Sequence, residues 1–245
     1  MKRAKLVVLL SILFPLLVFG QAWGKEPKPA PTPPTIEDIL ERYVRAVGGR
    51  AAVEKITSRV MKGSLITAAG TARTEIYQKA PGKFLVIIDS PAGGVSKNAF
   101  DGAVAWSQNR QRGLREMSGA EVENFKREYD VQRELKLKQL YPKMGIKGLE
   151  KVGERDAYVL TAVAADGVEE TMYFDGEDGL LLRRDVTLQG TTIQTYFQDY
   201  REVGGVKVPF TIKRQRGDFS FTYNFEQIEH NVAIDDTKFT KPVAN

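Results

Sequence analysis

From Ser58 to the end of the chain, apart from one helical segment, the apolar residues alternate as they do in β-strands. Most of the alternating segments are separated by turns that contain glycine, which supplies the positive φ of tight hairpins. Neighbouring segments are therefore expected to pair as antiparallel strands. The pattern predicts about ten to twelve strands in one sheet, and a sheet of that length tends to curl.

The last expected strand has the clearest pattern. Phe219, Phe221, Tyr223 and Phe225 share one face, and polar residues occupy the other face. The earlier strands are expected near Met61–Leu65 and Ala72–Ile76 and at 83–89, 96–100, 103–108, 113–117, 157–163, 169–175, 180–188, 191–200 and 206–216.

Two helical segments precede the sheet. Apolar residues recur at helical spacing from Ile36 to Val47, and Thr35 with Asp38 has the pattern of a capping box. Gly48 and the next glycine end this helix. A short second helix is expected at 50–56.

A longer helix is expected between Ser118 and Pro142, with Ser118 and Glu121 as a capping box. Its apolar stripe contains Val122, Phe125, Tyr129 and Leu135. Its other face is expected to be solvated and carries Lys126, Arg127, Arg133, Lys136 and Lys138. Together these elements predict a mainly β (α+β) fold, in which a strongly curved antiparallel sheet has helices on its concave face.

The N-terminal segments indicate export. Residues 1–24 have a basic start and an apolar run, as in a signal peptide, and 25–34 form a proline-rich spacer. Residues 35–245 are expected to form a single domain. Residues 1–24 contain three basic residues and no acidic residue, so 33 basic and 31 acidic residues remain, which gives little support for a nucleic-acid partner. Since the chain has no cysteine for lipid attachment, we expect a periplasmic protein without a membrane span.

The sequence offers little catalytic chemistry. It has one histidine, His230, and no cysteine, so a zinc or iron site would have to rely on carboxylates. His230 is expected to be a surface residue, and no nucleophile-elbow or P-loop motif is present. The acidic turn at 175–179 lacks the ligand spacing of an EF-hand. We therefore expect no enzyme activity, cofactor or metal, and a protein that binds through apolar surface.

Four segments carry a resemblance to a known family. They are "YQKAPGKF" (77–84), "FDGAVAWSQN" (100–109), "MYFDGEDGLLLRRDV" (172–186) and "IDDTKFTKP" (234–242). In pattern and order they resemble the LolA-like periplasmic carriers of outer-membrane lipoproteins. The resemblance implies an incomplete β-barrel whose hydrophobic cavity accepts acyl chains beneath a helical lid, without a cofactor, and envelope transport proteins as further partners. Carriers of this family commonly have an arginine at the position of Ala80, where Lys79 is a candidate substitute.

The predicted cavity residues follow from this resemblance and from the strand alternation. They are Met61, Leu65, Ile76, Phe84, Val86, Val104 and Trp106, with Val122, Phe125 and Tyr129 on the lid. Phe100, Val104 and Trp106 are expected to share one face, which makes Trp106 a natural reporter of lipid binding.

The sequence is also compatible with two other functions. An envelope protein-binding or sensor module could use the same curved sheet, with the basic helix face and residues 110–116 as its interface. A hydrolase of lipids or sugars would need a carboxylate pair or His230.

Overall fold

The computed structural model describes residues 33–188 and 190–243. The predicted signal peptide and residues 25–32 of the predicted spacer lie outside the described residues. Residues from Pro34 onward belong to one compact unit. Among the helices described, none combines the length and apolarity needed to cross a bilayer.

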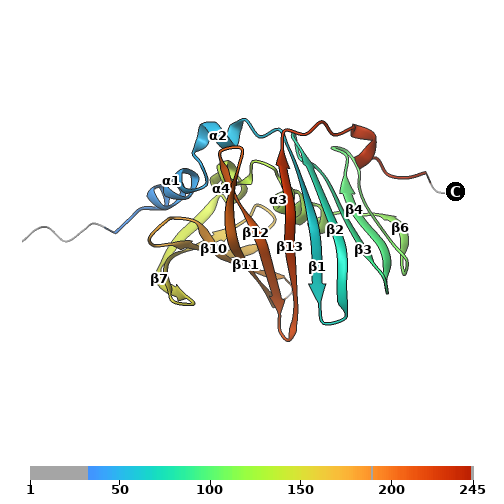
Figure 1. Ribbon diagram of the computed structural model, residues 1–245. Helices are drawn as coiled ribbons and strands as arrows, with labels where there is room; N and C mark the ends of the chain where they lie inside the picture. The colour runs from blue at the N-terminus through green and yellow to red at the C-terminus, as the bar shows by residue number, and fades with distance from the viewer. Residues whose placement is uncertain (1–32, 189, 244–245) are drawn as a thin grey trace, which may run out of the picture. The chain divides into compact units, whose positions relative to one another are not determined.

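The described residues contain thirteen strands, which form one antiparallel sheet (Figure 1). The first six strands are β1 (Ser58–Thr67), β2 (Gly70–Lys79), β3 (Lys83–Ser90), β4 (Gly94–Phe100), β5 (Ala105–Asn109) and β6 (Gly113–Glu116). The others are β7 (Lys143–Val152), β8 (Arg155–Val163), β9 (Glu169–Asp175), β10 (Leu181–Leu188), β11 (Thr191–Val203), β12 (Val206–Arg216) and β13 (Phe219–His230).

The two halves of the sheet join at its centre. The strand order is β6-β5-β4-β3-β2-β1-β13-β12-β11-β10-β9-β8-β7, so the first and last strands pair with each other. β6 and β7 lie at the ends of this order, and among the described strands they do not pair. The expectation of a long antiparallel sheet that curves without closing is confirmed.

Helix α1 (Ile36–Ala46) begins as predicted. The Thr35 hydroxyl accepts a hydrogen bond from the Asp38 amide at 3.1 Å, and the Asp38 carboxylate accepts one from the Thr35 amide at 2.9 Å. Gly48 follows with φ of 125°, and a Cβ there would lie 2.1 Å from the Gly205 carbonyl oxygen. Glycine is therefore required where the end of α1 meets the turn between β11 and β12.

The predicted long helix is two helices, α3 (Ala120–Tyr129) and α4 (Arg133–Leu140). The Asp130 carboxylate accepts a hydrogen bond from the Gln132 amide at 2.9 Å, a local turn that competes with helix continuation. The N-cap of α3 is Gly119 without a side-chain hydrogen bond, so the predicted Ser118 capping box is wrong. A shorter helix, α2 (Arg50–Glu54), follows α1.

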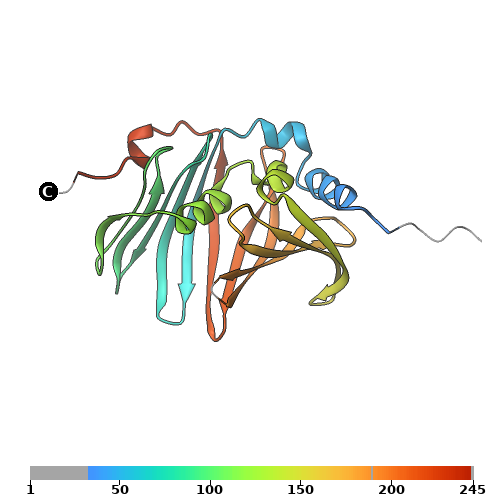
Figure 2. The same ribbon diagram turned by 180° about the vertical axis from the view of Figure 1, so that it is seen from behind.

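Apolar side chains pack on both faces of the sheet. Figure 2 shows α3 and α4 lying across one face, which we call the inner face, where the larger core cluster forms. The opposite, outer face is covered near β3 to β5 by the C-terminal segment, which includes the 3₁₀ helix η1 (Asp236–Phe239). The curved sheet thus has one core beneath its helices, a second beneath its C-terminal segment, and a third, smaller cluster on β8 to β10 that contains Ala157, Val159, Tyr173 and Leu182.

Strand β7 was missed by the sequence reading. Its side chains alternate between exposed and half-buried, and Ile146 and Leu149 are exposed. β7 is an edge strand that pairs only with β8 among the described strands, and it contributes few core residues. Its sequence pattern therefore resembles that of a loop.

Candidate functional site

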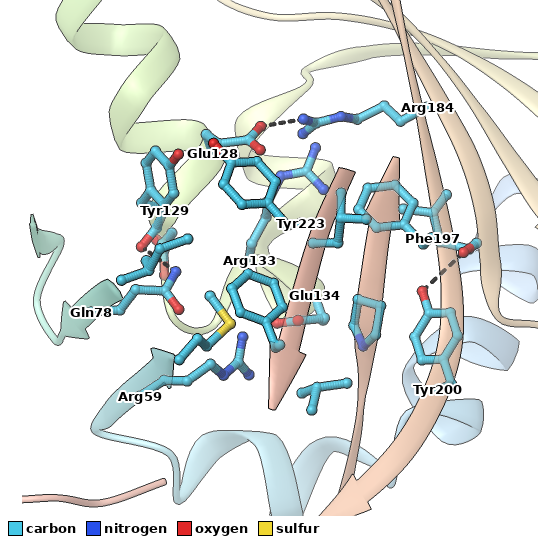
Figure 3. Close-up of a pocket in the computed structure, with 18 of the residues that line it drawn as sticks. Arg59, Gln78, Glu128, Tyr129, Arg133, Glu134, Arg184, Phe197, Tyr200 and Tyr223 are labelled. Atoms are coloured by element: carbon cyan, nitrogen blue, oxygen red, sulfur yellow. Dashed lines mark hydrogen bonds and ion pairs between the residues drawn. The ribbon is translucent and has the colours of Figure 1, made fainter. Parts of the chain in front are cut away.

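A cavity lies between the inner face of the sheet and the helices α3 and α4 (Figure 3). Its volume is about 120 Å³. Strands from both halves of the sheet supply its apolar wall, which contains Met61, Ile76, Leu181, Phe197, Ile212 and Phe225. Tyr43 of α1 and Tyr129 of α3 also line it. The site therefore joins distant parts of the chain.

The rest of the cavity wall is charged. Among the described residues, its lining includes the basic side chains of Arg59, Arg133, Arg184, Lys207 and Arg214. The acidic side chains are Glu128, Asp130 and Glu134, all on or between α3 and α4. Four of the five basic side chains are on strands, whereas Arg133 and all three acidic side chains are on or between the helices. The sheet side therefore has a net positive charge and the helix side a net negative charge, which attracts the helices to the sheet.

The central ion pair is formed by Glu128. Its carboxylate accepts hydrogen bonds from the guanidinium groups of Arg184 on β10 and Arg214 on β12, and Figure 3 shows it directed at Arg184. The side chain of Arg184 is 5% exposed and lies 3.8 Å from a second carboxylate, that of Glu170. Burial lowers the pKa of Arg214 from its ordinary value. One carboxylate of α3 thus compensates two arginines of the sheet.

Further polar contacts hold the helices. Gln78 of β2 donates a hydrogen bond to the Tyr129 carbonyl at 2.8 Å, and Arg127 pairs with Asp166 at 2.7 Å. Arg133 of α4 lies 3.3 Å from Glu170. Arg127 is buried, whereas the apolar residues of α3 are half-buried. Polar contacts therefore contribute much of the attachment of α3 to the sheet.

The apolar contact of α3 is an aromatic stack on β3. Phe84 is fully buried, and its ring centroid lies 5.5 Å from that of Phe125 and 5.2 Å from that of Tyr129. Such pairs contribute about 0.5–1.5 kcal/mol each beyond the area they bury.

The cavity is too small for a lipid while the helices are in place. A volume of 120 Å³ corresponds to about four water molecules, whereas ligand pockets commonly have about 300–1,000 Å³. An acyl chain could enter only if α3, α4 or the side chains beneath them moved.

The structure places most of the predicted cavity residues on the inner face. Met61 and Ile76 line the cavity, and Leu65, Phe84 and Val86 are buried in the core beside it. The predicted lid residues Val122, Phe125 and Tyr129 pack against this core, and Tyr129 reaches the cavity.

The prediction that Val104 and Trp106 line the cavity is wrong. Val104 lies in the loop before β5, half-buried and outside both clusters. Phe100 pairs with Ala105, which belongs to the inner cluster, so Trp106 points to the outer face. Its indole nitrogen donates a hydrogen bond to the Phe239 carbonyl at 2.8 Å. The turn is one residue longer than the alternation implied, and one residue of shift exchanges the faces.

This placement predicts how Trp106 responds to lipid. In the mature protein, saturating palmitate is expected to leave the emission maximum of Trp106 unchanged, because the sheet separates the indole from the cavity. A tryptophan introduced as Phe125→Trp in a Trp106→Phe background is expected to shift its emission instead. A shift from Trp106 and none from position 125 would place the lipid on the outer face.

The hydrogen bonds of the Lys79 amino group do not go to α3 or α4. Its amino group donates to the Ile234 carbonyl at 2.8 Å and to Asp236 at 2.7 Å, on the outer face. Lys83 also pairs with Asp236, and the two lysines lower the pKa of this carboxyl to about 2. Lys79 therefore fixes the C-terminal segment, and Gln78 provides the contact with α3.

His230 is half-buried rather than a surface residue. Its Nε2 accepts a hydrogen bond from Nε of Arg59 at 3.0 Å. Burial, and then the charge of Arg59, lower the pKa of His230 from 6.5 to about 4. His230 is therefore neutral near pH 7 and orients Arg59 as a hydrogen-bond acceptor.

The lowered pKa of His230 predicts a pH effect on stability. The unfolded chain binds a proton at His230 below about pH 6.5, whereas the folded chain does so only below about pH 4. The contribution of His230 is complete above pH 6.5 and is lost as the pH falls toward 4. Urea unfolding should show a greater loss of stability between pH 7 and 4.5 in the wild type than in His230→Gln. Parallel pH profiles would show that His230 is not buried as described.

The basic helix face is not simply solvated. Arg127 is buried against Asp166, Arg133 lines the cavity and Lys136 pairs with Asp130 at 2.7 Å. These side chains make contacts within the protein and help to hold the helices in place. This weakens the case for this face as the interface of a protein-binding module.

Arg184, Arg214 and Glu128 were missed as site residues by the sequence reading. A register shift between Leu181 and Arg183 interrupts the alternation of β10, so the face of Arg184 could not be read from its neighbours. Arg184 stands between Arg183 and Asp185, and Arg214 lies in the polar run 213–216, so neither arginine stands out from its neighbours as a buried charge.

The acidic turn at 175–179 has a structural role. Asp175 is buried and its carboxylate pairs with Arg155 at 2.5 Å. It also accepts hydrogen bonds from the amides of Glu177 and Asp178. Within the described residues, no group of three or more histidine, aspartate or glutamate side chains is arranged to hold a metal ion.

Comparisons with known proteins identify the class of fold. No protein-family model and no curated protein sequence matches this chain. Among solved structures, a LolA superfamily protein from Nitrosomonas europaea superposes with a TM-score of 0.62 at 14% identity, covering 85% of this chain and 99% of that one. A DUF1329 family protein from Desulfovibrio piger gives 0.60 at 16% identity, covering 84% and 97%.

A third similar structure is a domain assigned to outer-membrane lipoprotein sorting, from Vibrio parahaemolyticus. Its TM-score is 0.58 at 16% identity, and the match covers 82% of this chain and 96% of that domain. The chain therefore has a LolA-like fold, as its sequence motifs implied.

Proposed function

We propose that this protein is a non-enzymatic periplasmic carrier that binds the acyl chains of a lipid or lipoprotein between the sheet and α3–α4. The observation that carries the proposal is the cavity itself. Its apolar wall lies at the centre of the curved sheet, and its cover is a helix pair attached largely by side-chain contacts. The LolA-like fold supports the same conclusion.

The free energy of acyl-chain binding is large enough to displace α3 and α4 from the sheet. Transfer of an acyl chain from water provides about 0.8 kcal/mol per methylene, so a chain of about fifteen methylenes provides about 12 kcal/mol. Disrupting a buried ion pair costs about 3–5 kcal/mol. Binding of a long chain can therefore offset the loss of the contacts made by Glu128, whereas a short chain cannot.

A large side chain that fills the cavity is expected to block lipid binding, whereas the same side chain at an exposed position is not. Ile76→Trp places a large side chain where the apolar wall is exposed to the cavity, and we expect it to weaken palmitate binding about tenfold or more. The matched control is Val95→Trp at an exposed position of β4, which should bind as the wild type does. Affinities measured by isothermal titration calorimetry with delipidated protein test this. Equal binding by both variants would exclude this cavity as the acyl site.

A further inference from the structure

Arg59 is a buried cation without an acidic partner. It lies at the start of β1, lines the cavity and is 7% exposed. Among the described residues, no aspartate or glutamate oxygen lies within 4.0 Å of its guanidinium, and its Nη2 has no hydrogen-bond partner. Its hydrogen-bond acceptor is the neutral ring of His230. A buried charge of this kind is costly unless a counter-charge reaches it.

The acidic groups of the cavity are mostly engaged elsewhere. Glu128 is bound by Arg184 and Arg214, and Asp130 is bound by Lys136. Glu134 of α4 has one carboxylate oxygen without a partner, and it lies more than 4.0 Å from Arg59. Arg133, Arg184 and Arg214 all have carboxylate partners, and Lys207 is exposed, so Arg59 is the buried basic side chain of the cavity for which the described residues provide no ion pair.

A polar acceptor and an apolar wall adjoin Arg59. Gln78 is its register neighbour on β2, is 3% exposed and has an unpartnered Oε1 (Figure 3). Two residues along β1 and β2, Met61 and Ile76 begin the apolar wall. A ligand in this place would meet a cation and an acceptor at one end and apolar side chains beyond them.

We propose that Arg59 binds the anionic headgroup of the cargo, a carboxylate or a phosphate monoester carried on an acyl chain that lies along Met61 and Ile76. The guanidinium donates to the headgroup oxygens, and Gln78 accepts a hydrogen bond from a protonated or hydroxylated headgroup. This inference rests on the proposed function and adds the chemical class of the headgroup to it.

The test compares amphiphiles with the same chain and different headgroups. Palmitate, 1-palmitoyl lysophosphatidate and the neutral 1-palmitoylglycerol are titrated into delipidated mature protein. We expect the wild type to bind at least one anion about tenfold or more tightly than the neutral lipid. The tighter of the two anions distinguishes a carboxylate from a phosphate site.

Arg59→Gln should weaken the preferred anion about tenfold and change the affinity for the neutral lipid less than about twofold. Its urea midpoint should equal or exceed that of the wild type, because a buried unpaired charge has been removed. Arg73→Gln, at an exposed position of β2, is the matched control and should retain the discrimination.

Equal wild-type affinity for anionic and neutral lipids would overturn this inference and leave the proposed function intact. If Arg59→Gln kept the full wild-type preference for the anionic lipid, this inference would also be overturned and the proposed function would stand. Failure of all three lipids to bind would overturn the proposed function itself.

Discussion

Replacing Glu128 with glutamine is expected to lower the free energy of unfolding by roughly 3 kcal/mol and to release α3 from the sheet. The carboxylate is bound by two arginines, and Arg184 and Arg214 would lose their shared counter-charge. Arg184 retains Glu170 nearby, whereas the described residues provide no other carboxylate within 4.0 Å of Arg214. Urea unfolding measures the stability, and amide hydrogen exchange of residues 120–129 measures the release.

The control for this variant lies five residues earlier on the same helix. Glu123 pairs with Lys126 at 3.0 Å, but both side chains are exposed, and exposed pairs contribute about 1 kcal/mol or less. Glu123→Gln should therefore unfold and exchange nearly as the wild type does. If the two variants behaved alike, Glu128 would not hold the lid.

Phe84→Ala is expected to lower the free energy of unfolding by about 3–5 kcal/mol. Phe84 is fully buried, and both Phe125 and Tyr129 stack on it, so the substitution leaves a void beneath α3. Hydrogen exchange should accelerate in α3 more than in β8 and β9, which lie in the other half of the sheet. Phe219→Ala, at an exposed aromatic of β13, should change the stability by about 0.5 kcal/mol or less. A similar loss in both variants would show that the stack does not anchor α3.

The strand alternation and the cap of α1 were predictable from the sequence because each depends on near neighbours. The face shared by Phe221, Tyr223 and Phe225 in the sequence is also shared in the structure, where the successive rings lie 5.6 Å and 5.9 Å apart. The capping box of Thr35 formed for the same reason. Local periodicity and local hydrogen bonds do not require knowledge of the tertiary fold.

The errors arose where one residue decides the outcome. The length of the turn before β5 set the face of Trp106, and a bulge in β10 set the face of Arg184. The Asp130 turn divided one expected helix into two. The ion pairs of Glu128 join residues 56 and 86 positions apart, and no local pattern indicates such pairs.

The central claim is that an acyl chain binds between the sheet and α3, and photo-crosslinking tests it most directly. Delipidated mature protein is irradiated with palmitate that carries a diazirine near its methyl end, and the modified peptides are identified by mass spectrometry. We expect adducts on the inner face at β1, β2, β12 or α3, and their loss with excess unlabelled palmitate and in Ile76→Trp. Adducts confined to the outer face beneath the C-terminal segment, or adducts that excess palmitate does not remove, would contradict the claim.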